Sequence, residues 1–350
     1  MNLIVNSLPT RTWRHLKMNE STVKVEGEFH THLPEASGTS PEVRWVAQTE
    51  SEETDLGACS GIVELTKDAP VSILEARTAM TAPVLLTYAY APSEQAASRL
   101  VLKAPENTVL SVVLLLKSSA EAAAVLRTEV YAEKNAKVQL YMAQLLDSRA
   151  LAITDVSGIC ADGASVELTR LELGGGKVYT DCHIDLKGKE AAFTTDIGYH
   201  AAKGQILDMN YLALHHGPAT SSLMEISGTL EEGSRKIFRG TIDFQQGCKE
   251  AKGTETENVL LMGENMVNQT IPLILCREED VEGNHGASIG QLDDKVLFYL
   301  GSRGMEPEAA KHLIARSRIE AVCARIPLEE VRQQVHAFED QRGMLHGEEL

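Results

Sequence analysis

The middle of the chain alternates apolar and polar residues, which is the period-two pattern of strands that bury one face. The alternation is clearest at positions 138–142 (Val-Gln-Leu-Tyr-Met) and 166–173 (Val-Glu-Leu-Thr-Arg-Leu-Glu-Leu). Glycine, asparagine and aspartate separate these short runs, as is typical of the turns between strands. The pattern therefore predicts a mainly β core.

The strand starts also repeat at a nearly constant spacing. Four of them begin at a turn residue, Asn107, Asn135, Gly163 and Glu190, so that the starts lie 28, 28 and 27 positions apart. The copy at Glu190 is looser than the other three, and a further loose copy begins at Asn284. A repeat of this kind in an all-β stretch is typical of a solenoid, in which each unit buries its face on its neighbours. The spacing favours a parallel β-helix, and the alternative is a β-sandwich whose turns coincide by chance.

Both ends of the chain depart from this pattern. Residues 8–53 are polar and contain Pro9, Pro34 and Pro41, which predicts an irregular arm over residues 1–60 with one short helix or extended piece around residues 12–18. From Glu306-Pro307 onward the apolar residues recur every three or four positions, which indicates helices, and proline is favoured in a first helical turn. The predicted organisation is an N-terminal arm (1–60), a β-helix core (61–304) and a C-terminal helical domain (305–350).

The charge balance excludes several classes of protein. The formal charge is −17, whereas a nucleic-acid-binding protein needs a cationic face, and so does a protein that docks on an anionic membrane.

The longest apolar run, at 109–116, is too short to span a bilayer. Six scattered cysteines without a C-x-x-C pair indicate neither a zinc site nor a disulfide framework. Since the N-terminus also shows no secretory signal pattern, we expect a cytoplasmic protein.

Sequence motifs for catalysis are equally scarce. The run Gly174-Gly-Gly-Lys177 lacks the spacing of a phosphate-binding loop, and the chain has neither a G-x-S-x-G nor an H-E-x-x-H motif. His215 and His216 are adjacent on a predicted strand, so they face opposite sides and are expected to make structural hydrogen bonds instead of chelating one ion. We therefore predict no catalytic residues and no enzyme activity.

Two motifs near the end of the β region carry a resemblance to a known family. His285-Gly-Ala-Ser-Ile-Gly is followed by Leu297-Phe-Tyr-Leu-Gly-Ser-Arg-Gly304, and both lie downstream of Phe238-Arg-Gly-Thr-Ile-Asp-Phe. Together with the stretches at 8–14 and 215–222, these residues resemble the SufB/SufD family of iron–sulfur cluster assembly proteins. Gly286 stands where SufB-like chains carry glutamate, and Glu257 precedes the Leu-Leu-Met-Gly run where they carry a cysteine. Both features resemble the SufD branch.

The resemblance implies a right-handed β-helix with a C-terminal helical domain. It also implies a scaffold that pairs with a SufB homologue and binds a SufC-like ATPase. That ATPase would dock on the helical region, where the candidate contacts are Leu313, Ile314, Ile319 and Val322. A second apolar stripe, formed by residues 328, 331, 335 and 338, is instead expected to cover an end of the β-helix, because an unpaired sheet edge needs protection.

The candidate site residues follow from the same resemblance and from ligand chemistry. His285 is the first candidate for an iron or cluster site at the subunit interface, since imidazole is a good ligand for iron. The alternative is a turn histidine that hydrogen-bonds the neighbouring coil. Cys248 and Cys276 could supply thiolates and Glu257 a carboxylate, although a free cysteine usually fills space in a core. Gly283 stands where SufD proteins can carry a cysteine, so we expect no cofactor bound tightly by this chain alone and an iron–sulfur cluster held only transiently.

Three functions remain open from the sequence. The leading one is a non-catalytic scaffold subunit of a SUF complex. The second is a SufB-like homodimeric scaffold in a reduced SUF system. The third is a β-helix carbohydrate-active enzyme, against which the low aromatic content of 5% counts, because sugar-binding grooves present aromatic platforms.

Overall fold

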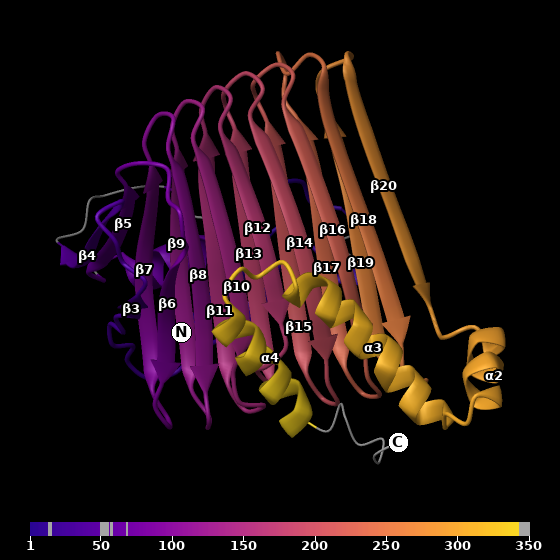
Figure 1. The fold of residues 1–350 in the computed structure, drawn as a ribbon. Helices are drawn as coiled ribbons and strands as arrows, with labels where there is room; N and C mark the ends of the chain where they lie inside the picture. Colours follow the sequence, from indigo (N-terminus) through magenta and orange to yellow (C-terminus); the bar gives the residue numbers. More distant parts are fainter. Residues whose placement is uncertain (13–15, 50–55, 57–58, 68, 343–350) are drawn as a thin grey trace.

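The computed structural model describes residues 1–12, 16–49, 56, 59–67 and 69–342. Two nine-stranded sheets face each other and form a β-solenoid of about eight turns over residues 71–290 (Figure 1). From β5 to β20, each strand pairs in parallel with the next strand but one in the sequence. Thus β10 pairs with β12, and β11 pairs with β13. The predicted parallel β-helix is therefore confirmed over the β-sandwich.

The first sheet has the order β20-β18-β16-β14-β12-β10-β8-β6-β3 and the second has the order β19-β17-β15-β13-β11-β9-β7-β5-β4. The strands of the solenoid are β5 (Val71–Ala76), β6 (Val84–Tyr90), β7 (Gln95–Ala104), β8 (Val109–Ser118), β9 (Ala123–Ala132), β10 (Lys137–Leu145), β11 (Leu151–Cys160), β12 (Ser165–Glu172), β13 (Lys177–Leu186), β14 (Ala192–Ala201), β15 (Ile206–His215), β16 (Ser221–Leu230), β17 (Arg235–Phe244), β18 (Ala251–Leu261), β19 (Val267–Cys276) and β20 (Val281–Gly290).

The repeat seen in the sequence marks one corner of the solenoid. Asn107 and Asn135 adopt positive φ angles of 60° and 55°, and each donates its backbone N–H to the next coil. The side-chain amide of Asn135 also donates to Asn107 Oδ1 at 3.1 Å. The same corner conformation recurs at Gly163, Glu190, Ala219 and Glu250. Asn284 does not belong to this series, because it lies inside β20.

The N-terminal segment is more regular than its composition suggests. Strands β1 (Asn2–Val5) and β2 (Ser21–Lys24) form an antiparallel pair, and helix α1 spans Ser60–Thr66. Strands β3 (Glu35–Ser37) and β4 (Val43–Thr49) pair antiparallel with β6 and β5, so they close one end of both sheets. These short strands have no clear alternation and are defined by their tertiary partners. The helix or extended piece expected at 12–18 lies partly outside the described residues.

Helices α2 (Asp294–Ser302), α3 (Pro307–Cys323) and α4 (Glu329–Gln341) follow the solenoid. Glu306 is the N-cap of α3 and Pro307 occupies its first turn, as predicted. The helical part nevertheless begins at Asp294, before residue 305. Among the helices of the described ranges, none combines the length and the apolar character needed to cross a membrane.

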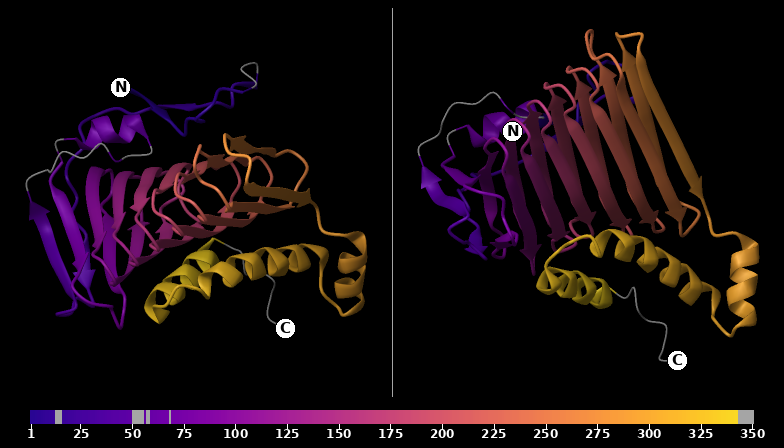
Figure 2. Two further views of the ribbon diagram at one scale, coloured as in Figure 1. Left: turned by 90° about the horizontal axis from the view of Figure 1, so that it is seen from above. Right: turned by 45° about the horizontal axis from the view of Figure 1, so that its top comes forward.

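The N-terminal segment and the C-terminal helices cover opposite outer faces of the solenoid (Figure 2). Residues of β1, β2 and α1 pack on the second sheet, for example Leu3 near Val125. Helices α3 and α4 pack on the first sheet, where Val331 and Val335 are buried with Val113. The expectation that the last apolar stripe covers an end of the β-helix is therefore wrong. The run at 109–116 explains why: β8 is apolar on both faces and needs a cover on its outer side.

Candidate functional site

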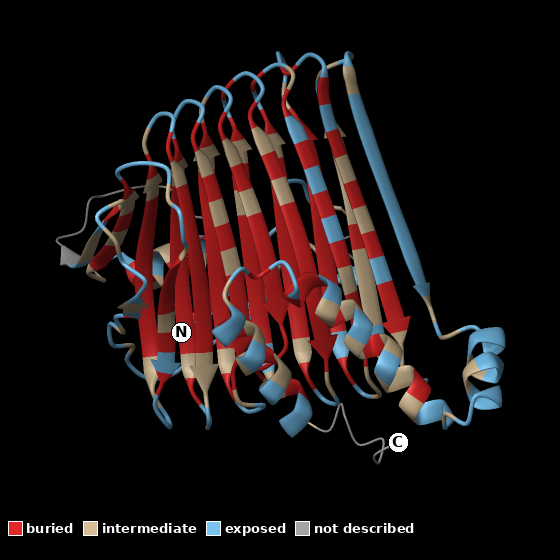
Figure 3. Cartoon of the chain, viewed as in Figure 1, coloured by how far each residue is buried: buried red, intermediate tan, exposed pale blue. Residues whose placement is uncertain are grey.

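His285 lies at the open end of the solenoid, opposite the end closed by β3 and β4. It belongs to β20, the last strand of the first sheet, whose residues 282–289 are all exposed (Figure 3). Its register partner on β18 is Glu255, so both side chains point to the same side of the sheet. That side is the interior, because Glu255 is only 2% exposed. His285 is thus an edge-strand residue above a buried carboxyl group, and not a turn residue.

The coil below His285 contains a buried ionic cluster. Lys236 on β17 forms an ion pair with Glu257 on β18, and both side chains are fully buried. Thr270 on β19 donates to Glu257 Oε2 at 2.7 Å and accepts from Lys236 Nζ at 3.0 Å. Tyr199 donates to Glu257 Oε1 at 3.4 Å. The Glu257 carboxylate is therefore saturated by groups of its own chain, which leaves it poorly placed to serve as a cluster ligand.

Glu255 differs from Glu257 although the two carboxyl groups are neighbours on β18. Burial, reinforced by the Glu257 charge and opposed by Lys236, raises the pKa of Glu255 to about 8. The backbone at Gly240 gives it room, because a Cβ there would collide with the Glu255 carboxyl. A carboxyl group that is largely protonated near neutral pH lies beside the exposed imidazole of His285. Together they offer an oxygen and a nitrogen donor to an ion that enters from the open end.

The two candidate cysteines have different environments. Cys248 is fully buried in the solenoid core, and burial raises the pKa of its thiol. Cys276 ends β19 and is exposed, with its thiol donating to Glu278 O at 3.0 Å. All six cysteines lie in the described part of the chain, and Cys276 is the exposed one among them. Cys276 is the last residue of β19, whereas His285 lies in the middle of β20, and none of the described contacts joins either cysteine to His285.

The four candidate contacts for a partner ATPase also separate. Leu313 is 49% exposed and Ile314 is half-buried on α3. Ile319 and Val322 are buried against the first sheet, so in this conformation they fix α3 to the solenoid. Helix α2, which contacts α3, also carries exposed apolar residues, most clearly Phe298, which is 79% exposed.

Glu255, Lys236 and Thr270 were not predicted as site residues from the sequence. A signal was present, since Glu255 and Glu257 share the strand side of Ala251 and Val259, which are core positions. Two carboxyl groups at inward positions of a strand are unusual unless they are paired. The expectation for the histidine pair is confirmed: His215 is buried between Thr220 and Ser222, at 2.8 Å from each hydroxyl.

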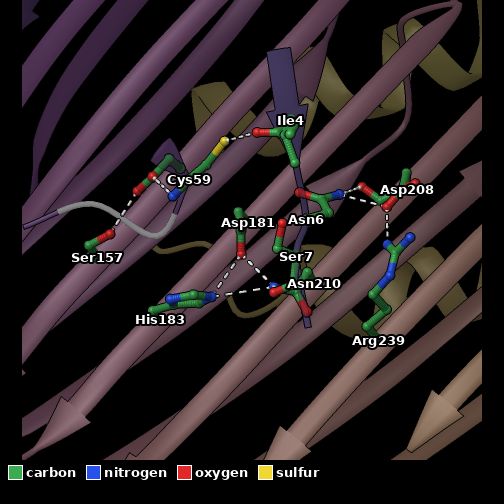
Figure 4. A network of polar contacts seen from close by, with 11 residues as sticks. Ile4, Asn6, Ser7, Cys59, Ser157, Asp181, His183, Asp208, Asn210 and Arg239 are labelled. Carbon is green, nitrogen blue, oxygen red and sulfur yellow. Dashed lines mark hydrogen bonds and ion pairs between the residues drawn. The ribbon is translucent and has the colours of Figure 1, made fainter. Parts of the chain in front are cut away.

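A second polar network joins the N-terminal segment to the outer face of the second sheet (Figure 4). Asn6 donates to Asp208 Oδ1 at 2.6 Å, and Ser21 donates to the same carboxylate. Arg239 forms a fully buried ion pair with Asp208 and donates to Met18 O at 2.7 Å. These contacts link residues about 200 positions apart in the chain, which no local pattern could indicate.

The same network holds the start of α1. Cys59 donates its backbone N–H to Asp155 Oδ2 at 2.9 Å. Burial and the neighbouring Asp181 raise the pKa of Asp155 to about 7. Asp181 in turn accepts from Asn210 at 2.8 Å and lies 3.2 Å from His183 Nε2. Because each carboxyl group bonds to the chain itself, this network serves to anchor the N-terminal segment.

Glu255 predicts a pH dependence of stability. Its pKa is about 8 in the folded chain against 4.5 in the unfolded chain, so the folded state holds an extra proton between these pH values. Stability must therefore fall as pH rises through this window. In Glu255→Gln this loss is absent, and we expect the variant to gain at least about 1 kcal/mol relative to the parent between pH 5 and pH 8. Urea unfolding of the isolated chain at several pH values measures this difference.

The matched control is Glu282→Gln, at an exposed carboxylate of β20 whose pKa is lowered by Lys252 and Asn284. Its stability relative to the parent should not rise across the same window. If the difference in the free energy of unfolding between Glu255→Gln and the parent stays constant with pH, the assigned environment of Glu255 is contradicted.

Comparison with known proteins places this geometry in a family. The model of the SUF system FeS cluster assembly, SufBD core domain, matches residues 87–318. The iron–sulfur cluster assembly protein SufD of Bacillus subtilis is 26% identical over 181 residues, which cover 51% of this chain and 38% of the relative. A SufBD family protein of Staphylococcus saprophyticus is 27% identical over 151 residues, which cover 43% of this chain and 32% of the relative. The chain thus spans about a third of the length of these curated relatives.

Proposed function

Because this chain belongs to the SufBD family of the SUF iron–sulfur cluster assembly system, we propose that it is a non-catalytic scaffold subunit whose open solenoid end pairs with a second SufBD-type chain. The observation that carries this proposal is the asymmetry of the two ends. Strands β3 and β4 close one end, whereas β19 and β20 leave a free edge on each sheet. Family membership also removes the basis for the carbohydrate-active alternative.

The exposed edge of β20 supports pairing on physical grounds. A free edge strand presents unpaired backbone groups, and monomeric proteins protect such edges with lysine, proline or bulges. Strand β20 is ten residues long, has neither lysine nor proline, and carries a single acidic residue, Glu282. It runs parallel to β18 in unbroken register, without a bulge. Such an edge favours addition of another strand, which a homologous solenoid end can supply.

His285 lies within this proposed interface and is the residue of this chain that we assign to the cluster cargo. Its imidazole is exposed above Glu255, and imidazole is a known ligand of iron in clusters. One histidine cannot hold a cluster, and Cys276 lies on the other sheet. Glu255 adds one oxygen donor, the paired chain would supply the remaining ligands, and we expect cluster assembly only in the pair.

A second surface is proposed for a SufC-like ATPase. Phe298 and Tyr299 of α2 and Leu313 of α3 are large apolar residues that are 49–79% exposed, on two helices that contact each other. Ile314 lies half-buried beside them on α3. Exposed apolar residues that gather on neighbouring helices are typical of protein interaction sites. The buried Ile319 and Val322 keep α3 in place beneath this surface.

One co-purification experiment tests both surfaces. The chain is co-expressed with the SufBD-type and ATPase proteins of the same genome, and native mass spectrometry gives the composition of the complex. Gly286→Lys combined with Ser288→Lys in β20 is expected to remove the SufBD-type partner and leave the ATPase bound, because charges on an edge strand oppose strand addition. Phe298→Asp with Leu313→Asp is expected to do the reverse, because it places charge on the apolar docking surface.

The control is Ser221→Lys combined with Leu223→Lys, at two exposed positions of the internal strand β16. This variant should retain both partners. A complex that survives the β20 lysines would exclude pairing through the open end. A chain that pairs only with itself would support the homodimeric scaffold.

A further inference from the structure

A cluster of metal-binding side chains lies between α3 and α4, away from the open end of the solenoid. Glu320 and Cys323 are one turn apart on α3, and His336 faces them from α4. The Glu320 Oε2 and His336 Nε2 atoms are 2.7 Å apart, and Cys323 Sγ is 4.0 Å from the same nitrogen. All three donor atoms lie within 4.8 Å of one another. They come from two helices, so one ion would join the helices.

An unpartnered carboxyl group beside this cluster gives an independent indication. Glu339 lies one helical turn after His336 and is only 1% exposed. Neither of its carboxyl oxygens has a hydrogen-bond partner. Its carboxyl group interacts electrostatically with Arg316, and also with His336 and Glu320. Buried carboxyl oxygens are usually hydrogen-bonded, so two oxygens without such a bond leave room for an ion or an ordered water molecule.

The donor set and its dimensions fit a particular class of ion. Thiolate, imidazole and carboxylate together suit zinc and similar divalent transition metals, and they do not suit magnesium or calcium. Bonds of about 2.0–2.3 Å hold the donor atoms of a tetrahedral site about 3–4 Å apart. The 4.0 Å between Cys323 and His336 already meets this requirement. The Glu320 carboxylate needs only to turn from its hydrogen bond with His336 to face the ion.

We propose that Glu320, Cys323 and His336 bind a thiophilic divalent transition metal ion, with Glu339 completing the site directly or through a water molecule. On binding, the Cys323 thiol releases its proton to solvent and the sulfur forms the bond to the ion. Glu320 and His336 are partly exposed and provide the route of entry, while Cys323 is buried. The ion fixes α4 to α3, and through α3 to strands β12, β14 and β16.

Cobalt(II) is the probe that tests this site in the full chain. Metals are first removed with a chelator, and the chain is then titrated with Co²⁺. We expect one Co²⁺ ion to bind per chain. Binding should produce a thiolate-to-cobalt charge-transfer band and the visible absorption of tetrahedral cobalt. His336→Gln should weaken Co²⁺ binding at least tenfold, in line with about 10–100-fold effects even for groups that only support a ligand. Cys323→Ser should abolish the charge-transfer band, and Cys276→Ser, at the exposed thiol, should leave it intact.

A second measurement keeps the test decisive if Cys323→Ser does not fold. Zn²⁺ should raise the melting temperature of the parent chain and of Cys276→Ser, but not that of His336→Gln, because an ion bound to the folded state stabilises it. Circular dichroism confirms that each variant is folded. A Co²⁺ affinity that is unchanged in His336→Gln, or a charge-transfer band that disappears in Cys276→Ser, would overturn the proposal. So would the absence of any thiolate band at one equivalent of Co²⁺.

Discussion

Replacing Lys236 with methionine is expected to destabilise the folded chain by about 3–5 kcal/mol, the usual effect of breaking a buried ion pair. Methionine has a similar volume, so the change leaves the Glu257 carboxylate buried with only the hydroxyl groups of Thr270 and Tyr199. Burial lowers the pKa of Lys236 despite the adjacent Glu257, so attraction only partly offsets the loss of water around the ammonium group. Denaturant unfolding measures the change in the free energy of unfolding.

A double variant and a surface control separate the charge effect from simple loss of packing. Lys236→Met combined with Glu257→Leu should recover most of the stability, since an apolar pair can replace a buried ion pair without penalty. Lys252→Met breaks the exposed pair of Lys252 with Glu282, at 3.3 Å, and should change stability by less than about 1 kcal/mol. If Lys236→Met and Lys252→Met have equal effects, the Lys236–Glu257 pair is not desolvated as described.

Replacing Asp208 with alanine is expected to release the N-terminal segment from the second sheet. The variant removes the counter-ion of Arg239, which is fully buried, and the acceptor of Asn6 and Ser21. An uncompensated buried charge is destabilising by about 3–5 kcal/mol. Hydrogen exchange should therefore show protection of the amides in β1 and β2 reduced by at least about 100-fold, since about 1.4 kcal/mol corresponds to a factor of ten.

Asp185→Ala is the control for this experiment. Asp185 lies on β13 of the same sheet and pairs with Lys187 and His216, outside the network that holds the N-terminal segment. Its replacement should leave the exchange of β1 and β2 unchanged. Equal protection of these strands in Asp208→Ala and in the parent chain would show that the Asp208 contacts do not anchor the segment.

The sequence by itself determined the features that depend on local chemistry. The corner repeat at Asn107 and Asn135 was visible because asparagine tolerates the left-handed conformation that each corner requires. The start of α3 at Pro307 followed from the preference of proline for a first helical turn. The alternation predicted the strands, and the repeat spacing favoured the β-helix without any knowledge of which residues face each other in neighbouring coils.

The sequence also contains signals for the packing of the C-terminal helices and for the register of β20. The run at 109–116 is apolar at almost every position, and such a strand is buried on both faces. That pattern already required a cover on the outer side of the first sheet, which α3 and α4 provide. An offset of 30 residues also pairs Glu255 with His285. The looser repeat assigned to Asn284 hid this register by placing His285 at a corner.

Only the tertiary structure decided which residues meet across long separations. Asn6 and Asp208 are joined through the pairing of the N-terminal segment with an outer sheet face, and the two residues carry no shared pattern. The same holds for Cys323 and His336, which depend on how α4 packs beside α3. Burial also distinguished Cys248, which is enclosed in the turn before β18, from Cys276, which is exposed at the end of β19. Exposure and side-chain proximity result from the packing of whole elements, and local residue preferences do not specify that packing.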